Sequence, residues 1–376
     1  MEINRKLASI RRINNLSPIE GADLIEVATV DGWKVVVKRG EFLVGDLVVY
    51  FEIDSFIPHI YASFLSKGKE PSQYNDVKGE RIRTIKLRGQ ISQGLILPVD
   101  SIDSISFVSG WMHDDGVGTY LAVHEGDDVT EVFGVQKWEP VLSANLQGKA
   151  KGNFPTNIIP KTDQERVQNC FMEIQKKSKR LKTEKFWNEQ LQIVEERSTT
   201  IPPNFKEPTY EVTMKLDGSS MTLFKLNGEL RVCSRNLELD INEDNKDNAY
   251  VKMALSLADK LPEGLAFQGE LMGSGIQGNR DQLKEHKFYL FDVYDIIGGK
   301  YLTPLARRTE CSLRDFDHVP VLDVSVIAPN SVVEALKFAE GASINHKIRE
   351  GVVWKCNEDP TFSFKAINNT FLLGEK

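Results

Sequence analysis

A lysine stands where an alternating apolar segment ends, in the stretch YEVTMKLDGSSMTLF at residues 210–224. Lys215 is followed after one residue by Asp217 and Gly218, which are common turn formers, so the ordinary interpretation is a solvated strand end before a turn. The second interpretation is chemical. A lysine amine attacks phosphorus only when it is deprotonated, and burial or neighbouring cations lower its pKa. The four-residue pattern is weak evidence alone, so the rest of the chain decides between the two.

Further charged side chains stand in short segments downstream of this lysine. Glu350 is a candidate ligand for Mg²⁺ or Mn²⁺, because hard cations prefer oxygen ligands. The ordinary alternative, a surface acid before a strand, is disfavoured by the Gly-Val-Val-x-Lys that follows it. Glu270 lies between a glycine and two apolar residues, and a buried carboxylate needs polar partners. The segments, in chain order, are KLDGSS (215–220), SRN (234–236), FQGELMG (267–273), FYLFD (288–292), REGVVWK (349–355) and FSFKAI (362–367).

In this order the segments resemble the motifs of the covalent nucleotidyltransferase superfamily of ATP-dependent ligases and capping enzymes. Those motifs begin with Lys-x-Asp-Gly and end with Glu-Gly-x-Val-x-Lys followed by a strand lysine. Within the superfamily the chain is most similar to the RNA ligases related to phage RNA ligase 2, in the subgroup with an OB module at the N-terminus and no C-terminal domain. The segment FPTNIIPKTDQERVQN resembles these ligases too, and few residues follow Lys365. The resemblance covers nearly the whole chain.

The resemblance implies catalytic roles for five residues. Lys215 would be the nucleophile that becomes lysyl-AMP, in a pocket where Lys365 and a divalent metal lower its pKa. Lys365 would contact the α-phosphate of ATP, and Lys355 would occupy a neighbouring position. Glu350 would hold Mg²⁺ or Mn²⁺ directly or through water, and Asp217 would either orient a metal-bound water or position the reacting end.

The resemblance also implies residues that bind the nucleotide. Glu270 would bind the ribose hydroxyls, and Arg235 would bind the nucleotide or the RNA ends because its planar fork suits phosphate. Gly218 would permit a close approach of the backbone to the nucleotide. Phe291 either stacks on adenine or belongs to the core. The adjacent Asp292 is expected to be structural.

Composition and charge exclude several other classes of protein. The chain has 376 residues, which suggests two domains, and it is 41% hydrophobic and 27% charged. It contains no apolar run of membrane-spanning length and no apolar secretory segment near its start, so we expect no membrane partner and a cytoplasmic or nuclear location. The four cysteines are scattered, without zinc-site spacing. The net charge of −7 excludes a globally basic nucleic-acid-binding domain, and we expect a monomer.

Short β-branched or alternating runs fill the first part of the chain. Five such runs separated by Gly- and Pro-containing breaks predict an OB-like barrel over residues 1–135, which we expect to bind RNA. Four cations belong to one of its hairpins, namely Arg81, Arg83, Lys86 and Arg88. Four aromatic residues are either core or a stacking platform, namely Trp33, Phe42, Tyr50 and Phe51.

Residues 136–204 read as a linker with a helical segment. Thr162 and Glu165 match a capping box, and Val167, Phe171 and Ile174 follow at helical spacing. Residues 162–166 are therefore interpreted as a helix cap rather than as catalytic. A basic run follows, which is either a solvated helix face or a strip that contacts phosphates; it consists of Lys176, Lys177, Lys179, Arg180, Lys182 and Lys185.

Strand and helix patterns alternate over residues 205–376, which we expect to form the nucleotidyltransferase domain. Asn227 and Gly228 predict a hairpin turn. Residues 248–261 and 331–341 read as helices, the second started by Ser331. GVVWK and FSFKAI read as a closing hairpin. The predicted fold class is α+β: an N-terminal five-stranded OB-like barrel, a helical linker and an antiparallel-rich domain of the ATP-grasp-like ligase type.

The predicted function is that of an ATP-dependent RNA ligase that seals 3′-hydroxyl and 5′-phosphate ends, expected at nicks, in RNA repair. One alternative is a DNA ligase or a capping guanylyltransferase, against which the short C-terminal continuation argues. The other is a non-catalytic RNA-binding protein that combines an OB barrel with a degenerate transferase fold. Retention of four motif residues counts against such decay: Lys215, Glu270, Glu350 and Lys365.

Overall fold

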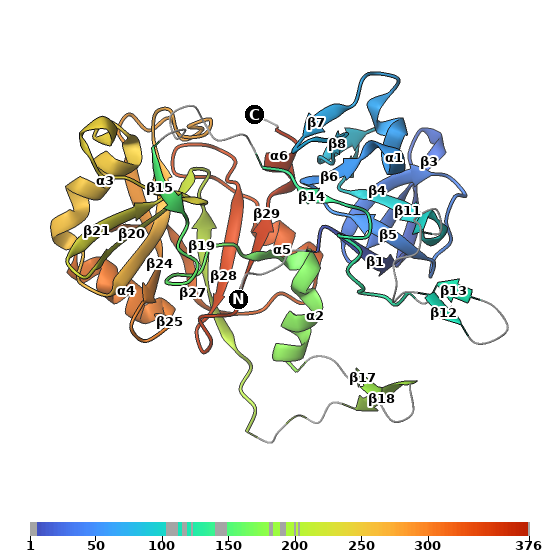
Figure 1. Ribbon diagram of the computed structural model, residues 1–376. Helices are drawn as coiled ribbons and strands as arrows, with labels where there is room; N and C mark the ends of the chain where they lie inside the picture. Colours follow the sequence, from blue (N-terminus) through green and yellow to red (C-terminus); the bar gives the residue numbers. More distant parts are fainter. Residues whose placement is uncertain are drawn as a thin grey trace. The chain divides into compact units, whose positions relative to one another are not determined.

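The computed structural model describes residues 6–102, 112–114, 119–121, 123–139, 149–179, 183–188, 193–198, 201 and 204–374. The chain divides into two compact units. Residues 4–141 form one unit, and residues 142–376 form the other together with the first three residues. Strands predominate in both units (Figure 1). In these ranges no helix combines the length and the apolar character needed to cross a membrane.

Short antiparallel strands build the N-terminal unit. One sheet has the order β1-β5-β11, a second is the meander β2-β3-β4, and a third has the order β14-β6-β8-β7. β9 pairs with β10, and β12 pairs with β13. The elements are β1 (Ala8–Arg12), β2 (Asn15–Ile19), β3 (Ala22–Val30), β4 (Trp33–Lys38), β5 (Leu47–Phe51), β6 (Ser55–Pro58), α1 (His59–Ala62), β7 (Ser72–Tyr74), β8 (Val77–Arg81), β9 (Ile85–Leu87), β10 (Gln90–Ser92), β11 (Leu95–Pro98), β12 (Met112–Asp114), β13 (Thr119–Leu121) and β14 (Gln136–Lys137).

The core of this unit settles the role of its aromatic residues. Trp33 and Tyr50 are each 1% exposed and their rings stack, with centroids 6.0 Å apart. Phe42 and Phe51 are also buried. These four rings are therefore core, and none of them offers a face for a base to stack on.

The five predicted strand regions of the N-terminal unit are present, but the unit contains more strands than predicted. The run RIRTIKL is divided between the end of β8 and β9, and β9 forms the predicted hairpin with β10. Strands β1, β2, β6 and β7 were not predicted, because they are short and lack a clear alternation.

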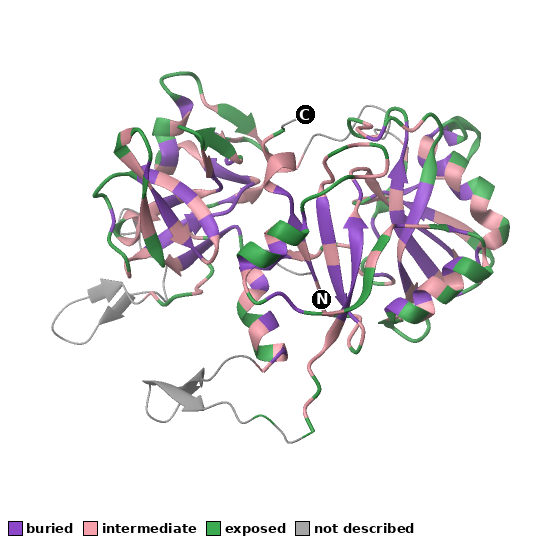
Figure 2. Ribbon diagram, turned by 180° about the vertical axis from the view of Figure 1, so that it is seen from behind, coloured by how far each residue is buried: buried purple, intermediate pink, exposed green. Residues whose placement is uncertain are grey.

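Two sheets organise the second unit. The first has the order β15-β22-β21-β20-β23-β24-β25, with β26 also paired to β24, and the second has the order β16-β29-β28-β19-β27. Figure 2 shows that the central strands of both are largely buried. The first sheet comprises β15 (Ala150–Asn153), β20 (Ser219–Leu226), β21 (Glu229–Cys233), β22 (Leu237–Leu239), β23 (Leu265–Met272), β24 (Lys287–Asp295), β25 (Lys300–Tyr301) and β26 (Asp317–His318), and the second comprises β16 (Glu165–Arg166), β19 (Thr209–Lys215), β27 (Val321–Ile327), β28 (Gly351–Cys356) and β29 (Ser363–Ile367).

Helices cover each sheet through their apolar faces. α3 (Ala249–Leu257) and α4 (Pro304–Leu313) pack on the first sheet, where they bury Val251 and Cys311. α2 (Val167–Lys177) and α5 (Val332–Phe338) pack on the second sheet, where they bury Ile174 and Ala335. The remaining elements are β17 (Thr183–Asn188), which pairs with β18 (Ile193–Ser198), and α6 (Asn369–Leu372).

Local chemistry explains several of these elements. Asn227 and Gly228 both have positive φ, 55° and 76°, as the predicted tight turn between β20 and β21 requires. The Ser331 hydroxyl accepts a hydrogen bond from the backbone N–H of Glu334 and thereby caps α5 as predicted. The closing hairpin is present as β28 paired with β29.

The predicted capping box at Thr162 and Glu165 is wrong. The residue before α2 is Arg166, which makes no side-chain cap, and Glu165 with Arg166 forms strand β16 parallel to β29. The helix cap does not form here because β29, which is distant in sequence, satisfies the same backbone groups within a sheet.

The segment predicted as a linker contributes to the second unit. β15 pairs with β22, β16 pairs with β29, and α2 packs on the second sheet. The basic run is not one helix, since α2 ends at Lys177 and β17 begins at Thr183. Arg180 and Lys182 lie outside the described residues, so the predicted strip remains a prediction.

Candidate active site

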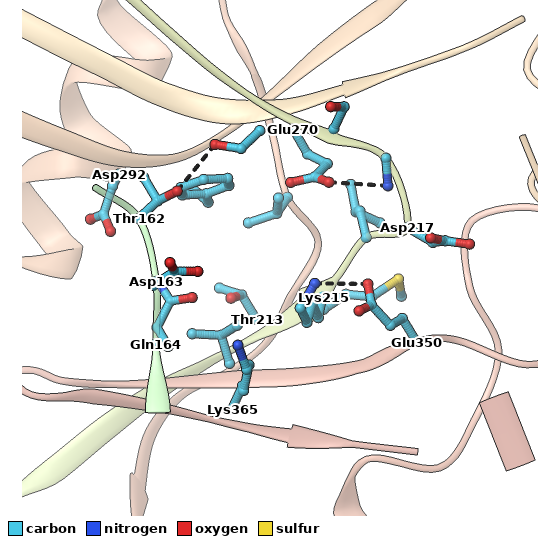
Figure 3. A pocket seen from close by; sticks show the side chains of 18 of the residues that line it. Thr162, Asp163, Gln164, Thr213, Lys215, Asp217, Glu270, Asp292, Glu350 and Lys365 are labelled. Carbon is cyan, nitrogen blue, oxygen red and sulfur yellow. Dashed lines mark hydrogen bonds and ion pairs between the residues drawn. The ribbon is translucent and has the colours of Figure 1, made fainter. Parts of the chain in front are cut away.

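A pocket of about 290 Å³ lies between the two sheets of the second unit. In Figure 3, Glu270 lies on the side of the first sheet, and Lys215 and Lys365 lie on the opposite side. All of the predicted site residues line this pocket, although they come from six separate segments of the chain: Lys215, Asp217, Gly218, Arg235, Glu270, Phe291, Glu350, Lys355 and Lys365.

Lys215 ends β19, a strand paired on one side with β27 and on the other with β28. The register places Lys215 opposite Gly351, the residue that follows Glu350. Its Nζ donates a hydrogen bond of 2.8 Å to Glu350 Oε2. The two side chains are 25% and 16% exposed, so this ion pair is shielded from solvent but still accessible from the pocket.

In the protein without a metal, the pKa of Lys215 is raised. Burial of the ammonium alone would lower its pKa, but the surrounding carboxylates, above all Glu350, then Glu270 and Asp217, outweigh burial and raise it. In the protein alone Lys215 is therefore a protonated lysine held by Glu350. The predicted lowering of the pKa included a divalent metal beside the lysine, so it stays a prediction for the metal-bound site; the acids were not considered in it.

Asp217 follows Lys215 at the opposite side of the pocket from the segment of residues 160–166 (Figure 3). Its burial and the neighbouring charge of Glu350 raise the pKa of the Asp217 carboxyl, while Lys215 and Arg280 act in the opposite direction. Two neighbouring carboxylates repel each other unless a cation lies between them. This wall of the pocket is therefore suited to a positive charge.

Glu270 lies on β23 of the first sheet, across the pocket from Lys215 (Figure 3). Its Oε1 accepts a hydrogen bond of 3.0 Å from the backbone N–H of Gly218. Burial raises the pKa of the Glu270 carboxyl to about 7. A Cβ at Gly218 would lie 2.5 Å from the carbonyl oxygen of Leu271, so the glycine is required by its close approach to β23.

A buried ion network lies at another wall of the pocket. Lys355 Nζ donates a short hydrogen bond to Asp292, and the two side chains are 7% and 4% exposed. Arg307 and Arg308 of α4 both donate to Glu211, whose side chain is 0% exposed. Burial raises the pKa of the Asp292 carboxyl, and the Lys355 ammonium opposes this. Lys355 thus bonds a carboxylate of the protein as well as lining the pocket.

Glu211 and Arg307 also line the pocket, although neither was predicted from the sequence. Glu211 lies four residues before the nucleophile candidate in a strand that otherwise reads as apolar. Arg307 belongs to α4, which was also missed. A signal for α4 exists, since Thr303 accepts from the N–H of Ala306 as the N-cap and Pro304 occupies the first turn.

The segment of residues 160–166 crosses from one sheet to the other beside the pocket. The carbonyl of Pro160 accepts from Gln268 of the first sheet, and the hydroxyls of Thr162 and Ser220 share a hydrogen bond of 3.1 Å. Asp163 pairs with Arg235 at 2.8 Å. This segment was interpreted as a helix cap, but it forms a wall of the site.

Phe291 and Lys365 complete the site. Phe291 is partly buried on β24 and lines the pocket, as a stacking residue requires. Lys365 lies on β29, opposite Val353 of β28. On its other side, β29 pairs with β16. A lysine, acids and further cations thus meet around one pocket, an arrangement suited to phosphoryl transfer.

Comparison with known proteins gives the same result for both units. A family model described as an OB-fold domain matches residues 7–99, and one described as RNA ligase matches residues 208–367. No curated protein matches the chain.

Solved structures of an RNA ligase from Naegleria gruberi resemble the whole chain. A lysine-to-alanine variant with ATP and Mn is 39% identical, with a TM-score of 0.79, and the match covers 98% of this chain and 99% of that one. A lysine-to-methionine variant with AMP and Mn has the same identity and TM-score and covers 99% of each chain. Another lysine-to-alanine variant with ATP and Mn is 40% identical, with a TM-score of 0.77, over 98% of this chain and 97% of that one. With this identity over nearly the full length, and with its chemical groups gathered in one pocket, the chain belongs to the RNA ligase family.

Proposed function

We propose that this RNA ligase uses ATP to join a 3′-hydroxyl and a 5′-phosphate end of RNA through an AMP adduct on Lys215. The observation that carries this proposal is the meeting of Lys215 with Glu350, Glu270 and Lys365 at one pocket. The relatives from Naegleria that contain ATP or AMP with Mn support the choice of nucleotide and metal.

The first reaction requires Lys215 to lose its proton. The Nζ–phosphorus bond then forms at the α-phosphate, the bond to the β-phosphate oxygen breaks, and pyrophosphate leaves. Negative charge grows on the α-phosphate oxygens, and the ammonium of Lys365 stabilises it. Lys355 also lines the pocket, but it is hydrogen-bonded to Asp292. It would therefore help to position the nucleotide and would not transfer a proton directly.

Different walls of the pocket would bind different parts of the nucleotide. Phe291 offers a ring for adenine, and the Glu270 carboxylate offers acceptors for the ribose hydroxyls. The N–H of Gly218 already occupies one oxygen of Glu270 and so fixes the orientation of the carboxylate. Arg235, held at the edge by Asp163, is placed to receive phosphate from the nucleotide or from the RNA.

The acids at this site fit a divalent cation. Glu350 and Asp217 would hold Mg²⁺ or Mn²⁺, since both offer hard oxygen ligands and the charge of Glu350 raises the pKa of the Asp217 carboxyl. When bound, the cation supplies positive charge to the phosphates and competes with Lys215 for Glu350. Within the described residues, no three His, Cys, Asp or Glu side chains gather as a metal cluster.

Two transfers to RNA follow adenylation. A 5′-phosphate oxygen attacks the adenylate phosphorus, the Nζ–phosphorus bond breaks, and Lys215 regains a proton. The 3′-hydroxyl oxygen then attacks the RNA phosphorus, loses its proton, and AMP leaves. We propose a nick as the substrate, because both ends are then held close together by the opposite strand.

Mass spectrometry of the intact protein tests this function. The protein, freed of bound nucleotide, is incubated with ATP and Mg²⁺ or Mn²⁺, and peptides are mapped for an adduct. We expect one AMP on Lys215, lost when 5′-phosphorylated nicked RNA is added. GTP in place of ATP tests the capping alternative.

Matched lysine variants control this experiment. Lys215→Arg should form no adduct, whereas Lys252→Arg should form it normally, because Lys252 lies on α3 and pairs with Asp247. A folded, metal-supplied protein that stays unmodified would refute the proposal and favour the non-catalytic RNA-binding alternative. An adduct on another lysine would refute the role of Lys215 alone.

A further inference from the structure

A second aromatic ring of the pocket has no role in adenylation as described. Phe371 lies on α6, directly after β29, and it lines the pocket together with Phe291 of β24. The two rings come from different elements, one on the first sheet and one beyond the end of the second. A ligase must hold two nucleosides, the adenosine of AMP and the RNA nucleotide at the break.

The position of Phe371 is coupled to Glu350 through Asn368. The backbone N–H of Asn368 donates to the carbonyl of Glu350 at 2.9 Å, and its side-chain amide donates to the carbonyl of Arg349 at 3.3 Å. The side-chain oxygen of Asn368 accepts from the N–H of Thr370 and so starts α6. Asn368 is only 3% exposed. One buried side chain therefore fixes α6 to the backbone that carries the proposed metal ligand.

Arg280 lies against the ring of Phe371. Its guanidinium carbon is 4.8 Å from the ring centroid, within cation–π range. The positive charge of Arg280 also acts to lower the pKa of the Asp217 carboxyl and so favours its ionised form. Arg280 is not itself one of the residues that line the pocket, but it packs on the Phe371 ring, which does, and its charge acts on Asp217.

The loop that carries Arg280 is held in one conformation. Gln277, Asn279 and Gln282 all have positive φ, between 41° and 51°, which is costly for residues other than glycine. Asp281 is 1% exposed, and its carboxylate accepts from the Ser343 hydroxyl at 2.8 Å and from the backbone N–H of Asn345 at 2.7 Å. Backbone strain maintained by a buried anchor is typical of a ligand-binding loop.

We propose that Phe371 and Arg280 form a second nucleotide subsite, which holds the terminal RNA nucleotide at the break. The phenyl ring packs against the base or ribose, and the guanidinium contacts a phosphate. This combination of an aromatic surface and a cation is the one that proteins use for unpaired or terminal nucleotides. The inference rests on the proposed function and adds the position of the RNA end to it.

The chemistry of this subsite fits either end of the break, and separate reactions distinguish them. Transfer of AMP from preloaded ligase to a 5′-phosphate requires the 5′ nucleotide to be in place. Sealing of RNA that already carries the adenylate also requires the 3′-hydroxyl nucleotide. Adduct formation from ATP requires neither.

Four variants test the subsite: Phe371→Ala, Phe371→Tyr, Arg280→Ala and Arg280→Lys. For the alanine variants we expect the RNA concentration at half-maximal rate to rise about tenfold, as the loss of one stacking or phosphate contact predicts. The ATP concentration at half-maximal adduct formation should change far less. Phe371→Tyr keeps the ring and should restore most of the RNA dependence, whereas Arg280→Lys should restore it only in part.

Controls come from residues of the same type outside the proposed subsite. Phe338→Ala removes a ring that packs on Trp354 of the second sheet, and Arg314→Ala removes a cation that pairs with Glu310 on α4. Neither should change the RNA dependence. Thermal unfolding of each variant checks that it is folded.

The outcomes separate the possible failures. A defect in AMP transfer places the 5′-phosphate nucleotide on Phe371, and a defect confined to sealing of preadenylated RNA places the 3′-hydroxyl nucleotide there. Unchanged RNA dependence in both reactions overturns the subsite, as does an effect on the ATP dependence as large as that on RNA. Failure of the parent protein to form any adduct would instead refute the proposed function itself.

Discussion

Two lysine–carboxylate pairs lie at the same pocket and differ in what surrounds them. Lys215 and Glu350 are 25% and 16% exposed, and their ion pair is 2.8 Å long. Lys355 and Asp292 are 7% and 4% exposed, and Arg307 Nη1 lies 3.8 Å from the second oxygen of Asp292. The first pair can open toward the pocket, whereas the second is enclosed by further charges.

The difference supports the proposal that Lys215, and not Lys355, is the nucleophile. A nucleophile must leave its counter-ion, lose a proton and reach phosphorus, so a pair at the pocket surface suits it. A lysine enclosed by Asp292 and the Arg307–Glu211 pair would leave a buried charge behind if it moved. The same two chemical groups thus serve reaction in one place and architecture in the other.

Lys215→Ala gives the largest expected effect. Adduct formation should fall by a factor of at least about 10³, because the nucleophile is absent. Sealing of RNA supplied with its adenylate already attached should remain at least partly intact, since that reaction needs no lysine nucleophile. Gel analysis of both reactions checks this. A folded variant unable to seal preadenylated RNA would show that Lys215 has a different role.

Asp292→Asn should be the most destabilising change at the site. It leaves the buried Lys355 ammonium without its counter-ion, which costs about 3–5 kcal/mol of unfolding free energy. Glu350→Gln, at the more exposed pair, should cost about 1 kcal/mol or less. Urea denaturation of the two variants measures the difference, and equal losses would contradict the comparison.

A double substitution sharpens that result. Lys355→Met combined with Asp292→Leu removes both buried charges and keeps similar volumes, so the double variant should be more stable than Asp292→Asn alone. A double variant as unstable as the single one would indicate that the remaining Arg307 and Glu211 depend on the pair.

Ionisation of Glu270 should make adduct formation depend on pH, which is a smaller effect than those above. Burial raises the pKa of its carboxyl to about 7, so below that pH the group is neutral and a weaker acceptor for ribose. The rate constant of adduct formation divided by the KM for ATP should therefore fall more steeply below about pH 7. Glu270→Gln should remove this steeper part. An unchanged profile would exclude Glu270 as its cause.

The same pKa makes a separate prediction about stability. A folded-state pKa above the ordinary value of 4.5 means that the folded protein binds the proton more tightly than the unfolded chain. The contribution of Glu270 to unfolding free energy therefore decreases as pH rises from about 4.5 to about 7. Comparison of urea unfolding for the parent protein and Glu270→Gln across this range checks the sign.

The smallest expected effect concerns the pair of Asp163 and Arg235 at the edge of the pocket. Their side chains are 43% and 50% exposed, so Asp163→Asn should change the unfolding free energy by less than about 1 kcal/mol. Thermal unfolding measures this. A larger loss would show that the segment of residues 160–166 contributes more to the fold than its exposed ion pair indicates.

Local patterns were sufficient to predict many elements of the second unit. Strand β19 and its lysine, the turn at Asn227 and Gly228, and helix α5 with its cap at Ser331 all follow from residues close together in the chain. The order of the six motifs predicted which side chains share the pocket. The family comparison confirms the resulting fold class and enzyme class.

Other features could not be read locally. Residues 162–166 match a helix cap, but the last two of them, Glu165 and Arg166, pair with β29 in a sheet. Trp33 and Tyr50 are equally compatible with a core and with a stacking platform, and only their 1% exposure distinguishes these roles. In each case the competing interaction comes from a distant segment.

The sequence alone was enough to indicate the chemistry of this protein, because a nucleophilic lysine, acids and cations in a fixed order define the reaction class. The tertiary structure decided the electrostatics. It set the pKa of Lys215 through three carboxylates, enclosed Lys355 with Asp292, and placed Phe371 at the same pocket. These outcomes depend on burial and on distances between groups from different strands, and charge interactions change steeply with both.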